Sequence, residues 1–261
     1  MKTDAFLAAS EFKRARKRLL KMHFESGVGH IGGNLSALDA MLIVWHEYLR
    51  EEDKFVLSKG HSAGALYIAL WSLGRLLEKD LKLFHKDNTL LAGHPPAQGI
   101  EEIPFATGSL GHGFSLAAGT ALGFKLKKND AQVVCLTSDG EWQEGSMWEA
   151  LIFACHHKLN NLTILIDHNN LQGFGSTTDI ASMSPLWVRL QGFETDLQVI
   201  DGHDHEAIRS ALETEQSRLK IIVLRTVKGK GVSFMENRMD SHYLPLTEDK
   251  FYKAIKEIDS L

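Results

Sequence analysis

Two apolar segments that each end abruptly in polar residues constrain the fold of this chain most. The β-branched run Val133–Thr137 leads into Ser138, Asp139 and Gly140, and a second run containing Leu165 and Ile166 ends before Asn169. This pattern is typical of buried parallel strands that end in functional loops. Because the carboxyl ends of parallel strands share one edge of an open sheet, we expect Asp139 and Asn169 to converge there.

The polar residues at these two strand ends are oxygen donors. A carboxylate, an amide oxygen and a main-chain carbonyl suit Mg²⁺ or Ca²⁺, and Mg²⁺ sites usually leave positions open for phosphate and water. Gly140 permits close backbone approach, and a helix expected over Ser146–His156 would direct its N-terminus toward the same place. An Asp-Gly pair alone more often marks a tight turn than a metal site. The prediction of a metal site therefore depends on the second polar pair, Asn169-Asn170, which lies at the end of the next predicted strand.

Composition excludes several classes of protein. The chain has 261 residues, 44% hydrophobic and 24% charged, which is enough for one large α/β domain or two small ones, and we expect a single domain over 1–261. A net charge of -4 gives no basic field for nucleic acid. No apolar run is long enough for a membrane span, and no signal peptide is apparent at the start. Cys135 and Cys155 read as reduced, buried thiols, so we expect a cytoplasmic protein.

Helical and strand patterns alternate along the chain. We expect a helical N-terminal segment over about 1–50, which includes an amphipathic helix from Asp4 to Phe24 and a helix that starts at Ser36. The segment 173–183 is polar, and we expect it to be ordered only by a ligand or a partner. The alternation of helices and strands along the chain predicts a doubly wound parallel sheet with helices on both faces. Further helices are expected over 63–73, 114–126, 204–212 and about 247–260, and further strands over 54–57, 197–200 and 221–224.

Several histidines occur in glycine- or proline-rich loops. His30 lies between glycines, His61 follows Ser58-Lys59-Gly60, and His94 precedes two prolines that stiffen its loop. A single histidine in a loop usually has no catalytic role, but rigid loops are suitable places to hold catalytic groups. The loop 107–113 is also rich in glycine, yet it lacks the spacing of a dinucleotide fingerprint.

Taken together, these motifs resemble the N-terminal, thiamine diphosphate-binding half of transketolases. The resemblance runs from about Ser26 to Leu246, and one departure is Ser138, where the metal motif usually has glycine. The motifs stand in family order. They are Gly29-His30, Ser58-Lys59-Gly60-His61, Gly93-His94-Pro95, Gly108-Ser109-Leu110-Gly111, Asp139-Gly140, Glu144-Gly145, Asn169 and Asp240-Ser241-His242.

The resemblance implies a role for each of these residues. Asp139, Asn169 and the carbonyl of Leu171 would bind Mg²⁺, or Ca²⁺ in its place. Gly140 and His61 would contact the diphosphate of the cofactor. The remaining positions implied to contact the cofactor are Gly108, Ser109, Leu110, Glu141, Asn169, Leu171 and His242, and those implied in catalysis are His30, His61, His94 and His242.

The resemblance also implies a partner. In this family a glutamate of a second, pyrimidine-binding domain activates the cofactor, and that domain would follow Leu261. We therefore expect a split enzyme in which a C-terminal transketolase subunit supplies this domain, with an α2β2 assembly and phosphorylated sugar substrates. Glu144 and Glu149 match acids between the two active sites of such dimers, and His112 replaces a common glutamine.

Other functions remain open from the sequence. The chain could belong to another thiamine-dependent enzyme, such as a deoxyxylulose-phosphate synthase or the α subunit of a 2-oxo acid dehydrogenase. It could also be a non-catalytic cofactor-binding subunit. The spaced histidines favour ketol transfer, because that reaction must deprotonate a hydroxyl group. A zinc hydrolase is disfavoured, because no histidine pair has a metal-ligand spacing on a helix with an acid.

Overall fold

The fold is built on a five-stranded parallel sheet. The computed structural model describes residues 6–260, so Asp4, where the first helix was expected to start, lies outside the described residues. The strand order is β1-β2-β3-β7-β6, and every pair of neighbours is parallel. The predicted α/β class is therefore confirmed. The strands are β1 (Lys54–Leu57), β2 (Val133–Ser138), β3 (Leu162–His168), β6 (Thr195–Asp201) and β7 (Leu219–Arg225).

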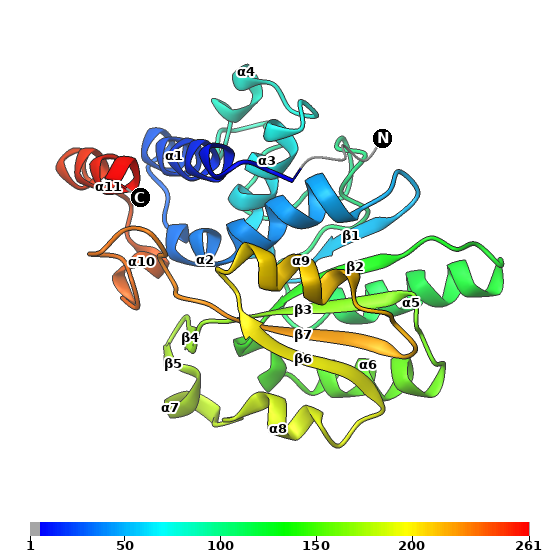
Figure 1. Cartoon of the computed structure of the whole chain (residues 1–261). Coiled ribbons are helices and arrows are strands. Elements are labelled where there is room, and N and C mark those ends of the chain that lie inside the picture. Colours follow the sequence, from blue (N-terminus) through cyan, green and yellow to red (C-terminus); the bar gives the residue numbers. More distant parts are fainter. Residues whose placement is uncertain (1–5, 261) are drawn as a thin grey trace.

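Helices cover both faces of this sheet (Figure 1). Successive side chains of a strand point to opposite faces, and in β2 Val134 and Leu136 join one core while Val133 and Cys135 join the other. Two apolar cores therefore lie back to back across the strands. The first is covered by α1 (Ala9–Ser26), α2 (Ile31–Ile43), α3 (Ala63–Ser72) and α9 (His205–Glu213), the second by α5 (Gly113–Leu126), α6 (Gly145–His156) and α8 (Leu186–Leu190).

Shorter elements gather beyond the carboxyl ends of the strands, where Figure 1 places β4, β5, α7 and α10. Residues 173–183 do not form only an irregular polar loop, because the segment contributes to a small hairpin and a capped helix, whereas its ordering on binding stays a prediction. The hydroxyl of Ser176 accepts a hydrogen bond from the Asp179 amide at 3.0 Å. These elements are β4 (Leu171–Gln172), β5 (Gly175–Ser176), α7 (Thr177–Ala181) and α10 (Asp240–Tyr243), and the last helix of the chain is α11 (Glu248–Ser260).

The start of α2 differs from the expectation. The helix begins at Ile31 rather than at Ser36, and it continues into a π-helical turn over Val44–Tyr48. Ser36 is fully buried, and its hydroxyl donates to Asp167 rather than capping the helix. By contrast, the predicted cap at Asp204 is confirmed, since its carboxylate accepts from the amides of Glu206 and Ala207.

His23 of α1 is a buried imidazole in the first apolar core. Its Nδ1 lies 3.0 Å from the carbonyl oxygen of Gly29, and Nε2 has no hydrogen-bond partner among the described residues. Burial lowers the pKa of His23 to about 4, so the folded state keeps this ring neutral.

Within residues 6–260, no helix is both long and apolar enough to cross a membrane.

We predict that His23 makes the fold acid-sensitive. Its pKa is lower in the folded state than in the unfolded state, so stability falls as pH drops below 6.5 towards 4. Between pH 7 and pH 5 this residue should cost about 2 kcal/mol of unfolding free energy. Urea denaturation of wild type and His23→Gln at both pH values measures the difference. Equal pH dependence of the two proteins would contradict the prediction.

Candidate functional site

The ends of β2 and β3 bring two polar loops together. Asp139 follows β2, and its amide donates to the Asp167 carbonyl at 3.2 Å. The Asp139 carboxylate accepts from the amide of Gly140 at 2.8 Å and from that of Asn170 at 2.5 Å. The loop after β3 therefore closes directly on Asp139. The carboxylate and the amide of Asn169 are both buried at this edge.

Three oxygens of these loops could hold a divalent cation. They belong to the Asp139 carboxylate, the Asn169 amide and the Leu171 main chain, and Asn169 Oδ1 accepts from the Leu171 amide at 3.1 Å. Burial and the neighbouring Asp167 raise the pKa of Asp139 to about 7. A cation would offset that cost, and hard oxygen donors suit Mg²⁺ or Ca²⁺. No group of three or more His, Cys, Asp or Glu side chains forms a metal site in residues 6–260.

A buried ion pair lies directly beneath the two loops. Lys59 and Asp167 have no solvent exposure, and the lysine ammonium donates to the carboxylate. Burial alone would raise the pKa of Asp167, but Lys59 and the hydroxyls of Ser36 and Thr226 keep it below its ordinary value. Asp167 is therefore ionised. Ser36 contributes a bond of 2.7 Å.

Lys228 enters the same site from the end of β7. Its ammonium donates to the Leu171 carbonyl at 3.3 Å and to His242 Nδ1 at 2.6 Å. Burial and the nearby charge of Lys59 lower the pKa of Lys228 to about 8. A cationic group thus lies beside the expected metal ligands, where an anionic ligand would be stabilised.

The three residues that follow β7, the 226–228 segment, make three different attachments. Thr226 donates to Asp167, and Lys228 contacts the Leu171 carbonyl. Between them, the Val227 amide donates to His203 Nε2 at 2.9 Å, while His203 Nδ1 lies 2.9 Å from Asp39. The segment is therefore fixed both to the site and to α2.

Three of the predicted histidines form one cluster. The ring centroid of His30 lies 5.0 Å from that of His242 and 5.9 Å from that of His61, and the His61 and His242 centroids are 5.9 Å apart. Burial, followed by the charge of Lys228, lowers the pKa of His242 to about 3. Burial also lowers the pKa of His30 and places that of His61 well below its ordinary value. The rings are therefore neutral at physiological pH.

His94 and the glycine loop border this cluster. A Cβ atom on Gly108, which has a φ of +148°, would lie 2.9 Å from Cδ2 of His94. Only glycine permits this approach without strain. Burial lowers the pKa of His94 as well. Ser109 and Leu110 follow in the same loop, where their carbonyls lie 3.2 and 3.1 Å from Nδ1 of His112.

Glu141 is fully buried beneath the site. Its carboxylate accepts from Ser58 at 2.5 Å and from Ser138 at 3.2 Å, which ties the end of β1 to the end of β2. Burial raises the pKa of Glu141 to about 7. Its contact with a cofactor stays a prediction, as does the placement of Glu144 and Glu149 between two active sites.

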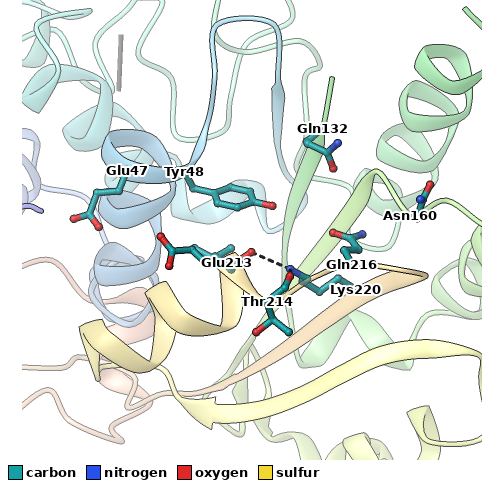
Figure 2. Close-up of a pocket in the computed structure, with 9 residues that line it drawn as sticks. Glu47, Tyr48, Gln132, Asn160, Glu213, Thr214, Gln216 and Lys220 are labelled. Atoms are coloured by element: carbon teal, nitrogen blue, oxygen red, sulfur yellow. Dashed lines mark hydrogen bonds between the residues drawn. The ribbon is translucent and has the colours of Figure 1, made fainter. Parts of the chain in front are cut away.

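A separate cavity of about 430 Å³ lies at the opposite edge of the sheet. Gln132 and Asn160, which line it, precede β2 and β3, and Figure 2 shows Gln216 beside Lys220 in the same cavity. The ammonium of Lys220 already donates to the carbonyls of Leu212 and Thr214 at 2.9 and 2.6 Å. This cavity therefore contributes nothing to the candidate site at the strand ends.

Five residues of this site received no role from the sequence. Lys228 could have been found, because it follows a predicted strand just as Asp139 and Asn169 do. The other four are Ser36, Lys59, Asp167 and Thr226, whose side chains meet only through tertiary structure.

Comparison with known proteins identifies the family. Residues 17–258 match the model of the transketolase, thiamine diphosphate binding domain. A 6-deoxy-6-sulfo-D-fructose transketolase subunit from Clostridium sp. (strain MSTE9) is 35% identical, with 94% of this chain and 93% of the relative aligned. An apulose-4-phosphate transketolase subunit from Phocaeicola vulgatus is 33% identical over 94% of this chain and 92% of its own length.

A solved transketolase structure shares the fold of this chain. The transketolase of Campylobacter jejuni superposes with a TM-score of 0.87 at 26% identity, and the match covers 97% of this chain but 43% of that enzyme. The similarity thus extends over nearly the whole chain in sequence and in fold. The chain therefore belongs to the transketolase family, in which it corresponds to the thiamine diphosphate binding domain.

Proposed function

We propose that this chain is the cofactor-binding subunit of a two-polypeptide transketolase. With its partner it transfers a two-carbon ketol unit from a phosphorylated ketose to an aldose. The observation that carries the proposal is the single edge at which Asp139, Asn169 and Leu171 meet, beside the cluster of His30, His61 and His242. The relatives that are named as transketolase subunits and align along almost their whole length support the division into two chains.

The metal in this proposal is Mg²⁺, with Ca²⁺ as a substitute. The Asp139 carboxylate, the Asn169 amide oxygen and the Leu171 carbonyl are its protein ligands. The raised pKa of Asp139 supports this assignment, because a cation beside a buried carboxylate favours its ionised form. Mg²⁺ binds few protein oxygens and completes its coordination with water and phosphate.

This chain would also hold the diphosphate of thiamine diphosphate. Gly140 and His61 would contact it, and Lys228 would add a cation from the end of β7. Gly108, Ser109 and Leu110 would contact the rings of the cofactor. Further contacts proposed for the cofactor come from Glu141, Asn169, Leu171 and His242.

The histidines move protons. Bound thiamine diphosphate supplies the electron sink for cleavage of a carbon–carbon bond. A neutral imidazole accepts the proton of a substrate hydroxyl and returns it in the second half of the reaction. His30, His61, His94 and His242 have lowered pKa values, because burial disfavours their charged forms. They are therefore available as proton acceptors at neutral pH.

We predict that His242→Ala slows turnover and leaves cofactor binding nearly intact. His242 contacts Lys228 rather than the expected metal ligands, so its removal spares the metal site. Loss of a general base typically costs about 10²- to 10⁴-fold in kcat. Steady-state kinetics and calorimetry of cofactor binding measure the two effects separately. Wild-type kcat in this variant would remove His242 from the catalytic residues.

The partner is a C-terminal transketolase subunit that carries a pyrimidine-binding domain, and we propose an α2β2 heterotetramer. Glu144 and Glu149 would then lie between its two active sites. We place the pair in the cytoplasm, where the free cysteines Cys135 and Cys155 stay reduced.

The experiment that tests the function begins with copurification of the partner. Calorimetry then measures thiamine diphosphate binding to the pair with and without Mg²⁺, and a panel of phosphorylated and modified ketoses tests ketol transfer. We expect metal-dependent binding and transfer to an aldose. Absence of Mg²⁺-dependent binding to the pair would refute the proposed cofactor, whereas binding without transfer would refute the proposed reaction.

A further inference from the structure

The carboxylate of Asp167 is enclosed beneath the proposed metal ligands. It receives a hydrogen bond from Lys59, which follows β1, from Ser36 in α2, from Thr226 after β7, and from the Asn169 amide group after β3. Lys59 is itself held by the Gly33 carbonyl at 3.0 Å. Four separate segments therefore fix one carboxylate, which has no solvent exposure.

The position of Asp167 determines the orientation of the Asn169 side-chain amide, that is, whether its NH₂ group or its oxygen faces Asp167. A carboxylate that already accepts from a lysine ammonium and two hydroxyl groups acts as an acceptor, so it selects the NH₂ group of a neighbouring amide. Asn169 Nδ2 donates to Asp167 Oδ2 at 3.3 Å, and Oδ1 points the other way, towards the Leu171 amide. A neutral acceptor and donor at position 167 would allow the Asn169 amide to turn over.

We propose that Asp167, locked by Lys59, is a positioning residue that orients the Asn169 amide so that its oxygen is presented to the divalent cation. This inference rests on the proposed function, because it concerns the binding of Mg²⁺ with thiamine diphosphate. Asp167 itself does not touch the ion. Hydrogen-bond partners of metal ligands commonly alter metal affinity by about 10- to 100-fold.

The test is calorimetry of thiamine diphosphate in the presence of Mg²⁺, with this chain assembled with its partner. Asp167→Asn should weaken the Mg²⁺-dependent binding by at least about tenfold. The swapped pair Asp167→Asn with Asn169→Asp should recover most of this loss. A carboxylate at position 169 presents an oxygen in either orientation, and the new amide at 167 donates to it. A purely structural role for Asp167 predicts no such recovery.

Ser36→Ala is the matched control. It removes one hydrogen bond from the same carboxylate oxygen but leaves both Lys59 and Asn169 in place. Its binding should stay within about threefold of wild type, against the tenfold expected for a displaced ligand. Thermal melts of every variant establish that the proteins fold.

Removal of Asp167 alone leaves Lys59 buried without its charged partner, which can prevent folding. In that case Lys59→Met combined with Asp167→Asn takes its place, since it leaves no unpaired charge, and it should show the same weakened binding. The proposal is overturned if Asp167→Asn, or this double variant, binds thiamine diphosphate within about threefold of wild type. It is also overturned if the swapped pair binds no more tightly than Asp167→Asn. If the wild-type pair shows no Mg²⁺-dependent binding, the proposed cofactor fails first, and the two failures are thereby distinguished.

Discussion

Asp139→Ala should abolish retention of thiamine diphosphate. Asp139 provides the only carboxylate among the proposed metal ligands, and its two oxygens also accept from the amides of Gly140 and Asn170. Its removal takes away the charge that binds Mg²⁺ and loosens the loop carrying the other two ligands. We expect Mg²⁺-dependent binding to weaken by more than about 100-fold, which exceeds the usual effect of a residue that only supports a ligand. Calorimetry with the assembled pair measures this loss.

The loss should not arise from unfolding. Burial and the charge of Asp167 raise the pKa of Asp139 to about 7, so an ionised Asp139 is unfavourable in the metal-free chain. The variant should therefore melt at or near the temperature of the wild type without metal. Asp179→Ala is the control, because Asp179 is an exposed acid of α7 near the site. Cofactor affinity within a few-fold of wild type in Asp139→Ala would remove Asp139 from the metal ligands.

The isolated chain should not turn over any ketose at a measurable rate. The proposed site would hold a metal, a diphosphate and proton-accepting histidines, but in the proposed two-polypeptide enzyme the group that activates the cofactor belongs to the second subunit. We expect turnover without the partner to be more than about 10³-fold lower than with it, since loss of one proton-transfer group alone costs 10²- to 10⁴-fold. Initial rates during titration of the partner into this chain measure the effect.

The titration has its own control. The rate should rise with added partner and reach a plateau at a fixed ratio of the two chains. Asp139→Ala, titrated in the same way, should stay inactive, which ties the rate to this chain's site. Transketolase activity of this chain alone, at a rate similar to that of the pair, would refute the two-polypeptide proposal.

The parallel sheet could be predicted from sequence, and so could the contact between the loops that follow β2 and β3. Runs of buried β-branched residues fix the strands, and parallel strands place their carboxyl ends at one edge. Asp139 and the loop of Asn169 accordingly lie in contact. The same rule applied to β7 indicates Lys228, whose position after a strand is equally informative.

The start of α2 could not be predicted, because tertiary contacts override local preference there. Serine often caps helices and glycine rarely occurs within them, so Ser36 looked like the first residue. The structure instead includes Gly32 and Gly33 in the helix, where a Cβ on Gly32 would lie 2.3 Å from the Ser241 hydroxyl. Close packing against α10 requires glycine, and Ser36 is released to bond Asp167.

The network around Asp167 could be predicted only in part. Lys59 and Thr226 follow the strands predicted over 54–57 and 221–224, so the strand-end rule places them at the same edge as Asn169. Ser36 lies within α2 instead, and serine, threonine and lysine are residue types that usually face solvent. Only the fold shows that all three donate to the Asp167 carboxylate.

The attachments of the 226–228 segment restrict how this chain can be recombined with its relatives. Thr226 donates to Asp167, and Lys228 donates to the Leu171 carbonyl. The Val227 amide donates to His203, which in turn contacts Asp39. A chimera with a crossover anywhere between α2 and β7 would mix partners from different parents. Exchange of substrate preference by grafting is therefore best attempted with the whole chain as the transferable unit.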